Sequence, residues 1–253
     1  MINYFRNIRH RLADENKYMK YMRYAIGEIL LIVIGILLAL YLNNLNLENS
    51  IRKDQVKILN ELVLNLDHTI VAFERTIQTE TSYLSHNLSI IDHFDQKKPY
   101  TESLDQLFGT YFWTVSSNPV TGAYDYLKSR GLNLIENDSL RQDLSFLFES
   151  DFRVLKEENQ FWANSFQENI SYPYHVKNFR KYYPERKNIS TLEFAKPINY
   201  QSLLDDPYFV SINAELVGNR RWNINSLKIL IVKIDGLKLQ IEGELERLQS
   251  EFM

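Results

Sequence analysis

Five histidines and several adjacent carboxylates are the residues of this chain whose types could support chemistry. The histidines are His10, His68, His86, His93 and His175. His86 and His93 lie seven residues apart, next to Asp92, a spacing that places both rings on one side of a helix. Two imidazoles and one carboxylate make a sparse metal site, and histidines at this spacing are more often ordinary surface or seam residues. We therefore expect no metal centre.

The remaining carboxylates and the known catalytic motifs give no stronger sign of catalysis. Asp205-Asp206 and Glu157-Glu158 are adjacent pairs, and adjacent side chains on a helix point in different directions, so neither is suited to acid–base work. The chain contains no glycine-rich phosphate-binding motif, no serine nucleophile elbow and no H-E-x-x-H zinc motif. We expect a protein without enzymatic activity and without a cofactor.

One further carboxylate, Glu28, is the single charge in residues 25–42, which read AIGEILLIVIGILLALYL. At about 1.5 Å per residue this stretch reaches about 27 Å as a helix, which is enough to cross a bilayer core. It predicts one transmembrane helix. Glu28 falls in the first turn, where it can extend to the lipid headgroups or pair with Arg23. The alternative is a role in ion movement or a contact with another membrane subunit.

Small residues follow one side of this predicted membrane helix. Gly27, Gly35 and Ala39 are separated by eight and four residues, so they form a stripe along which another helix can approach closely. Packing against a second helix is one interpretation of the stripe. The other is that glycine is simply frequent in membrane helices.

The flanking charges predict the orientation of the span. Residues 1–24 hold six Lys or Arg against two Asp or Glu, net +4, and no basic residue follows the span before Arg52. The positive-inside rule then places residues 1–24 in the cytoplasm, as a basic amphipathic segment on the inner membrane. Residues 43–253 would form a periplasmic domain. A cleaved signal peptide is the competing interpretation, but residues 41–44 offer no small-residue cleavage site.

Composition agrees with one sizeable domain beyond the span. The chain has 253 residues, of which 45% are hydrophobic and 24% charged, and it has no cysteine. The domain is long enough for its own core and contains neither disulfides nor thiolate chemistry. Residues 43–253 carry 23 Lys or Arg against 29 Asp or Glu, net −6, which argues against nucleic-acid binding.

Two long helices should dominate this domain. Apolar residues recur at alternating spacings of three and four over residues 56–94, with Glu80 and Asn87 as the exceptions. The same spacing returns over residues 205–252, where the exceptions are Asn213, Arg220 and Lys238. Polar residues at core positions fix the register of helix pairs at some cost in stability.

The fold class that follows is all-α. It consists of a single N-terminal transmembrane helix and an elongated antiparallel bundle with two long heptad-patterned helices. Such seams look the same whether they close within one chain or between chains. Further helices are predicted over residues 102–115, 121–129 and 139–168, with Gly131 and Asn137 or Asp138 as caps. The 139–168 helix has apolar residues on two faces, so we expect it to be covered on both sides.

Residues 170–200 differ from the rest in composition. They contain three prolines, five tyrosines and six Lys or Arg, with no sustained period, which favours an irregular, exposed segment. One interpretation is a recognition surface for another protein. Its candidate residues are Tyr172, Tyr174, Arg180, Tyr182, Tyr183 and Arg186. The other interpretation is a connection whose tyrosines pack on the bundle and whose cations offset its acidic faces.

Two stretches carry recognisable motifs. They are YAIGEI at residues 24–29, continued by IGILLAL at 34–40 and Asn43-Asn44, and TGAYDYLKSRGLNLIENDSLR at residues 121–141. Together they resemble an uncharacterised family of Bacteroidota membrane proteins known by a domain-of-unknown-function label. That family more often has Gln-Ile and a Trp where this chain has Tyr41-Leu42 and Leu45, so an interfacial Trp anchor is not expected. The resemblance implies an architecture and no activity.

These features favour a non-enzymatic single-pass protein of the inner membrane that serves as a structural or accessory subunit of a membrane complex. Its expected partners are the lipid bilayer and either itself or another inner-membrane or periplasmic protein, but no nucleic acid. Two alternatives remain: a bundle that senses a ligand or assists transport, and a homo-oligomer that conducts ions through Glu28. A sensor predicts an enclosed pocket in one bundle, whereas an interaction protein predicts exposed apolar surface along the seams.

Overall fold

A computed structural model of the chain describes residues 18–183 and 193–250. It is 83% helical with two short strands, which confirms the all-α class. The chain forms two compact units, of which the first ends at Gln55 and the second begins at Val56. Most of the basic amphipathic segment predicted over residues 1–24 lies outside the described residues.

The longest helix, α2, spans Tyr18–Asp95 and belongs to both units. Its first part contains the predicted membrane span. An 18-residue window in this part has a mean hydropathy of 2.6 and no buried residue, so the helix is long and apolar enough to cross a membrane. α2 ends within one residue of the predicted position, and Lys97 turns the chain with a positive φ of 48°.

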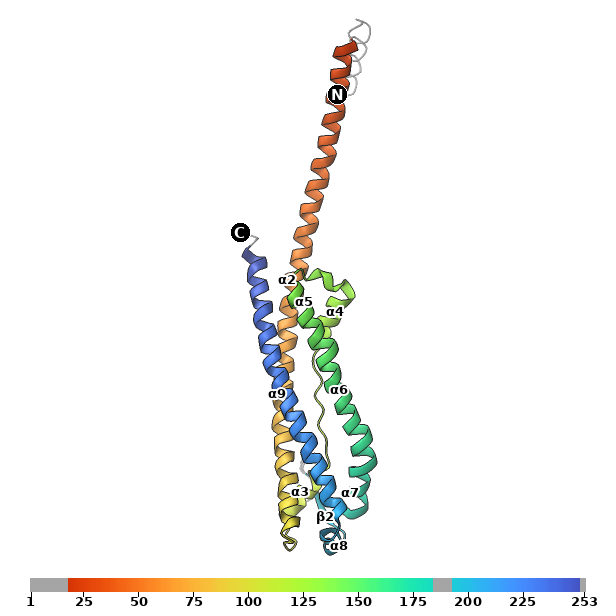
Figure 1. The fold of residues 1–253 in the computed structure, drawn as a ribbon, viewed down its shortest axis with the longest axis vertical. Coiled ribbons are helices and arrows are strands. Elements are labelled where there is room, and N and C mark those ends of the chain that lie inside the picture. Colours follow the sequence, from red (N-terminus) through yellow and green to blue (C-terminus); the bar gives the residue numbers. More distant parts are fainter. Residues whose placement is uncertain (1–17, 184–192, 251–253) are drawn as a thin grey trace. The chain divides into compact units, whose positions relative to one another are not determined.

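In the second unit, α2 packs antiparallel to α9, Pro207–Ser250, as the sequence predicts (Figure 1). Three side-chain contacts mark the direction: Asn87 with Asn213, Glu80 with Arg220, and Asp67 with Lys238. The partners advance along α9 as they recede along α2, so the two helices run in opposite directions. Every polar exception in the two predicted seams is therefore part of a contact between these helices.

The 121–141 motif forms a compact set of short elements beside the two long helices. It contains α4, Gly122–Arg130, the 3₁₀ turn η1, Leu132–Leu134, and the start of α5. Gly131 has a φ of 103°, which confirms the expected positive-φ cap and which favours glycine. The Asn137 side chain accepts a hydrogen bond from the Leu140 N–H at 3.2 Å, so the predicted N-cap is also confirmed.

A third long helical run extends from residue 138 to residue 178. Its successive parts are α5 (Asp138–Phe146), η2 (Leu147–Asp151), α6 (Phe152–Phe161), η3 (Trp162–Ser171) and α7 (Tyr172–Asn178). η2 and η3 are π-helical. A π-helix has more residues per turn than an α-helix, so each π segment changes the direction in which the side chains after it point. The expectation that this helix is covered on both sides holds only in part. Residues such as Leu144 and Phe148 are buried, but the Val154 and Phe161 side chains are 45% and 58% exposed.

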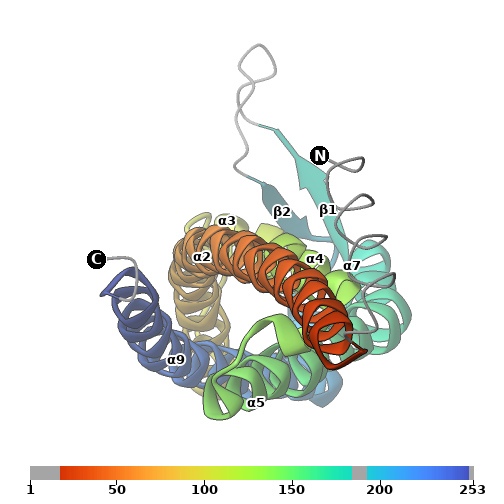
Figure 2. The same cartoon turned by 90° about the horizontal axis from the view of Figure 1, so that it is seen from above.

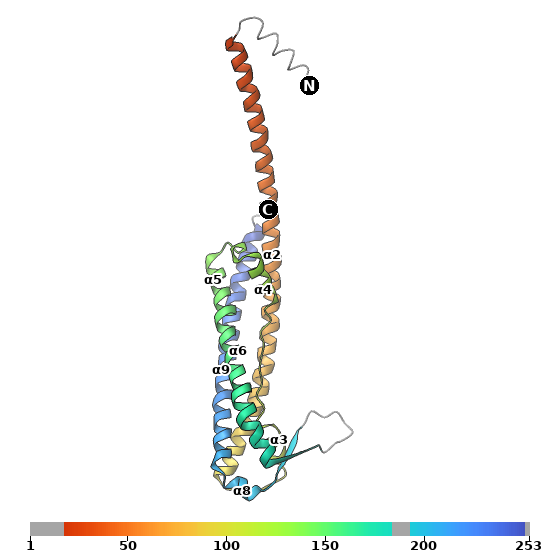
Figure 3. The same cartoon turned by 90° about the vertical axis from the view of Figure 1, so that its right-hand side faces the viewer.

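In contrast to the prediction, the described parts of residues 170–200, which are 170–183 and 193–200, consist mainly of short regular elements. After α7 the chain forms β1, Phe179–Tyr182, and β2, Phe194–Pro197, which pair antiparallel with Phe179 opposite Pro197. The short helix α8, Tyr200–Leu204, follows. The strands extend outward from the helices (Figures 2 and 3). Strands of four residues are too short to leave a clear alternation in the sequence.

Two hydrophobic clusters fill the second unit. The first joins α2 to α4, to α5 and α6, and to α9, around residues such as Leu62, Leu144 and Ile234. The second joins the end of α2 to α3, Leu104–Thr110, to the strands and to the start of α9. Its centre is aromatic, with the Phe94 and Phe209 rings 5.0 Å apart. The hairpin is attached to the helices through this second cluster.

The attachment of the hairpin depends on a close approach at Gly109 in α3. A Cβ at this position would lie 2.1 Å from the Glu193 carbonyl oxygen. We therefore expect Gly109→Ala to push the β2 segment away from α3 and to lower the free energy of unfolding by about 1–3 kcal/mol. The measurement is denaturant unfolding of the full-length protein in detergent. Gly218→Ala, at an exposed helical position with open space around its Cβ, is the control and should be neutral or stabilising. Equal losses for the two variants would contradict this account.

Candidate functional site

Four of the five polar residues that interrupt the two long seams meet in one buried cluster, and the fifth, Lys238, pairs separately with Asp67. Arg220 and Glu80 form an ion pair with 2.6 Å between Nη1 and Oε2, and both side chains are almost fully buried. Arg220 Nε also donates to Asn87 Oδ1 at 2.7 Å, and Asn87 Nδ2 donates to Asn213 Oδ1 at 2.9 Å. The sequence predicts these positions as polar interruptions, but it does not identify them as partners.

The same cluster holds the backbone of residues 111–121, which we call the strap. Most of the strap has no regular secondary structure. Arg220 Nη2 donates to the carbonyl oxygens of Tyr111 and Trp113, at 3.0 and 2.6 Å, and the Val115 N–H donates to Glu80 Oε1 at 3.3 Å. Buried backbone groups need hydrogen-bond partners, and here charged side chains supply them. The helix predicted over residues 102–115 therefore ends early, at Thr110.

Neutral side chains hold the rest of the strap. Thr69 Oγ1 accepts from the Val120 N–H at 2.9 Å, and Gln167 Oε1 accepts from the Thr114 N–H at 3.1 Å. Burial lowers the pKa of Arg220 from its ordinary value while the neighbouring carboxylate raises it, and a guanidinium in a protein keeps its proton. The cluster is shielded from solvent, so we assign it a structural role.

His86 and His93, the two histidines considered above as ligands of a sparse metal site, each have another partner. His86 Nδ1 lies 2.9 Å from Thr110 Oγ1. His93 Nε2 lies 3.0 Å from Tyr200 Oη and 3.2 Å from the Pro99 carbonyl oxygen. Over residues 18–183 and 193–250, no group of three or more His, Cys, Asp or Glu side chains is placed to hold a metal ion.

The candidate surface predicted within residues 170–200 divides into exposed and packed members. Tyr172 and Tyr183 are 47% and 55% exposed, and Arg180 is exposed on β1. These side chains are available to a partner. Arg186 lies outside the described residues.

Two other tyrosines of this predicted surface bond to acidic side chains of the domain. Tyr174 Oη donates to Asp206 Oδ2 at 2.6 Å, and the Tyr174 ring stacks on that of Phe209. Tyr182 Oη donates to Asp105 Oδ2 at 2.6 Å, and this bond raises the pKa of Tyr182 to about 12. Both side chains attach the hairpin region to the helices, as the alternative interpretation of this segment predicts.

His175 lies in an aromatic enclosure in the second hydrophobic cluster. Its ring is 4.2 Å from that of Phe112 and stacks on that of Phe179 at 5.0 Å, measured between centroids. The residue is 1% exposed and neither ring nitrogen has a hydrogen-bond partner. Burial lowers the pKa of His175 to about 4, with Lys181 acting in the same direction and Glu193 against it. The imidazole is therefore a neutral core side chain at neutral pH.

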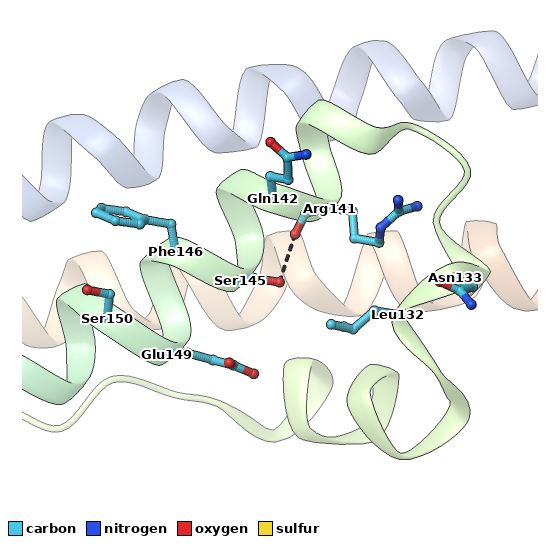
Figure 4. A pocket seen from close by; sticks show the side chains of 8 residues that line it. All are labelled: Leu132, Asn133, Arg141, Gln142, Ser145, Phe146, Glu149 and Ser150. Atoms are coloured by element: carbon cyan, nitrogen blue, oxygen red, sulfur yellow. Dashed lines mark hydrogen bonds between the residues drawn. The ribbon is translucent and has the colours of Figure 1, made fainter.

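A surface cavity of 510 Å³ lies beside the 121–141 motif, and Figure 4 labels the residues that line it. Its charged groups already support the fold. Arg141 Nη1 donates to the Ile135 carbonyl oxygen at 2.9 Å, and Glu149 accepts from Lys128 and Tyr124 at 2.8 and 2.9 Å. The charged groups of this cavity are thus engaged in hydrogen bonds and ion pairs that stabilise the motif, which does not favour a ligand site there.

Exposed apolar side chains gather on the outer face of α9, a feature that the sequence analysis did not identify. Trp222, Ile229, Val232 and Leu239 are 39%, 51%, 72% and 69% exposed. Their separations of seven, three and seven residues place them on one side of the helix, away from buried residues such as Ile234. The signal in the sequence is a second repeat, offset from the seam that packs inward.

α5 and α6 extend this apolar surface. A groove of 180 Å³ is lined by Val154, Trp222 and Ile229 among others. A neighbouring groove of 250 Å³ is lined by Phe146 and Gly236 among others, and Phe146 is 59% exposed. The two grooves share the ion pair between Lys233 and Asp151. We call this surface the outer patch, and its members are Phe146, Val154, Trp222, Ile229, Val232 and Leu239.

The outer patch has the properties of a docking surface. Buried aromatic side chains each contribute roughly 150–250 Å² to a contact, so a patch with two aromatic and four aliphatic members exposes several hundred Å². Contiguous exposed apolar areas of this size mark sites of protein or membrane interaction. It is the strongest candidate site in the described part of the second unit.

The site residues predicted in the membrane span lie in the first unit. Gly27, Gly35 and Ala39 are exposed there, and no atom of the described residues lies within 4 Å of a Cβ built on either glycine. Glu28 is partly exposed. Their sides are therefore open to contact with lipid or with another helix.

Comparison with known proteins adds a family and no activity. A family model described as "Family of unknown function (DUF6090)" matches residues 28–180, which is more than half of the chain. No curated protein matches the chain and no solved structure matches it. The matched range ends within β1, so it leaves out α9, although α9 contributes to both hydrophobic clusters.

The buried ion pair is testable by removing one partner. Arg220→Met leaves the Glu80 carboxylate buried without its counter-charge and removes the guanidinium donor from the Trp113 and Tyr111 carbonyls, of which Tyr111 keeps only the Asn87 amide. We expect the free energy of unfolding of the full-length protein to fall by about 3–5 kcal/mol. The double variant Arg220→Met/Glu80→Gln should lose clearly less than the sum of the two single variants, because the singles share one interaction. Strictly additive losses in denaturant unfolding would contradict the pairing.

The buried His175 predicts a pH dependence of stability. Its pKa falls from an ordinary 6.5 to about 4 in the folded chain, so between these values the unfolded chain binds a proton that the folded chain does not. The contribution of His175 to the free energy of unfolding is therefore fully present above about pH 6.5. It declines toward pH 4, by up to about 3 kcal/mol. His175→Phe keeps a ring in the enclosure and removes the titration. The free energy of unfolding should depend less on pH over this range in that variant than in the parent protein. An unchanged dependence on pH would show that other groups cause it.

Proposed function

We propose a function for this chain, which belongs to the DUF6090 family, a family of unknown function: it is a single-pass membrane protein that presents a helical docking domain to another protein. In this role it is a structural or accessory subunit of a membrane complex and catalyses no reaction. The observation that carries the proposal is the outer patch, an exposed apolar surface on a domain whose buried polar groups serve its own fold.

The membrane placement rests on the first part of α2 and on the charges around it. The apolar window is long enough to span and none of it is buried. The net charge of +4 before the span favours a cytoplasmic N-terminus. The resemblance to Bacteroidota proteins favours the inner membrane of a Gram-negative cell, with the second unit in the periplasm. Gly27, Gly35 and Ala39 then offer a side for packing against a second membrane helix, next to Glu28.

A protein partner explains the outer patch better than a small ligand does. Small-molecule sites enclose most of the ligand surface, whereas both grooves of the patch include side chains that remain about half exposed, such as Ile229 and Phe146. A face of exposed apolar residues along a helix is suited instead to a second helix laid against it. The ligand-sensing alternative therefore has less support than docking.

The proposal is tested by site-specific photo-crosslinking in living cells. A photoreactive amino acid replaces Leu239 in the patch or, as a matched control, Leu64, which is 58% exposed on α2. We expect a discrete protein adduct in the membrane fraction from the Leu239 position, at least about ten times stronger than from Leu64. Ile229→Asp should abolish that adduct, because a charge in the contact opposes burial of the patch, while Glu74→Gln, at an exposed position of α2, should not.

Each part of the proposal has an outcome that contradicts it. Recovery of the chain in the soluble fraction after alkaline extraction contradicts the membrane span. Equal crosslinking from Leu239 and Leu64, or an adduct that survives Ile229→Asp, contradicts docking through the patch.

A further inference from the structure

We propose that the protein docked on the outer patch is a second copy of this chain, with α9 of one copy packed in the same direction against α9 of the other. The inference rests on the proposed function and names its partner.

The first support is a second seam on α9 whose apolar side chains remain largely exposed among the residues that the structure describes. The positions on its outer face alternate in steps of three and four residues, and they are Trp222, Asn225, Ile229, Val232, Gly236, Leu239 and Gly243. The inner seam of the same helix is already closed by α2, α4, α5 and α6. A heptad-like stripe that remains exposed over three turns and more is the pattern of a helix with a second partner helix.

The second support is the pair of glycines in this outer seam. Gly236 and Gly243 lie inside a 44-residue helix, where each costs about 1 kcal/mol relative to alanine. No atom of residues 18–183 and 193–250 lies within 4 Å of a Cβ built on either one, so no contact inside the described domain requires glycine. A helix that packs closely from outside does gain from the missing side chains, because its backbone can approach further.

The direction of packing follows from the polar residues of the seam. With the helices parallel and in register, Asn225 of each copy faces its equivalent and their amides can pair, whereas an antiparallel arrangement places Asn225 opposite Gly243 and leaves the amide without a partner. Glu242 of one copy then approaches Arg247 of the other. Lys228 approaches Lys233, whose charge is already offset by Asp151 at 2.8 Å.

The outer patch supplies a large part of the area that such a dimer needs. The exposed parts of the outer patch amount to several hundred Å² per copy, and the flanking residues of α9 add to this. A stable interface buries about 800 Å² per partner. An interface of one helix face with its equivalent is isologous, so it closes after two copies and does not continue into a filament.

The absence of cysteine from the chain allows a direct test in membranes of cells that produce the full-length protein. Single variants Val232→Cys, Leu239→Cys and the control Leu64→Cys are oxidised and separated without reductant. We expect a disulfide-linked product of twice the 30.0 kDa chain mass from the first two variants and at least about tenfold less from Leu64→Cys, because a disulfide requires Cβ atoms roughly 4 Å apart. An Ile229→Cys chain that couples to a Leu239→Cys chain, while neither couples to itself, would overturn the parallel arrangement, because antiparallel packing with Asn225 opposite Gly243 places Ile229 opposite Leu239.

Gly236→Leu separates dimerisation from folding. The open space around Gly236 should let the variant keep the thermal stability of the monomeric domain or increase it, while the added side chain blocks close approach and reduces the Val232→Cys product at least about fivefold. Unchanged coupling overturns the inference. A photo-adduct at Leu239 with a different protein, together with no disulfide dimer, overturns the second copy and leaves the docking function standing. The absence of both the photo-adduct and the disulfide dimer overturns the second copy and the docking function together.

Discussion

The buried ion pair between Arg220 and Glu80 is the interaction on which the arrangement of the second unit depends. Transferring two charges from water to a protein interior costs several kcal/mol, and their mutual attraction offsets this only when the remaining hydrogen-bonding groups are satisfied. Here Arg220 meets that condition through Glu80, Asn87 and two carbonyl oxygens of the strap. A shift of α9 along α2 by one turn would separate all of these groups at once. The pair therefore holds the register of the two long helices and attaches the strap to both.

The strap shows why the sequence predicted the long helices well and the short ones less well. The seams of α2 and α9 extend over many turns, so their apolar period is clear and their polar exceptions stand out. The helix predicted over residues 102–115 has suitable apolar residues, yet it stops at Thr110 because Arg220 and Glu80 bond to the backbone that would have continued it. Those two side chains lie far away in the sequence. Their competition for the backbone groups depends on the tertiary register, which no local pattern contains.

The third helical run and the hairpin show two further limits of periodicity. A count in steps of 3.6 residues assumes uniform α-helical geometry. The π-helical turn η2 breaks that assumption, so side chains beyond it such as Val154 and Phe161 leave the core. The hairpin is fixed by contacts at single positions. Gly109 leaves room for the backbone beside β2, and Asp105 accepts the Tyr182 hydroxyl. Neither contact produces a period, so the segment resembles a loop in the sequence.

The two faces of α9 link the interior of the domain to its candidate function. Its inner face carries polar groups where apolar ones are usual, and its outer face carries apolar groups where polar ones are usual. The buried polar contacts of Arg220 determine the position of α9 along the axis of α2. The apolar contacts of residues such as Ile234 determine the rotation of α9 about its own axis. Together they decide which residues point outward. A surface presented in this way is rigid before a partner arrives, so little conformational entropy is lost when a second helix packs against it. The buried polar contacts of α9 thus help to position the exposed apolar residues of the outer patch.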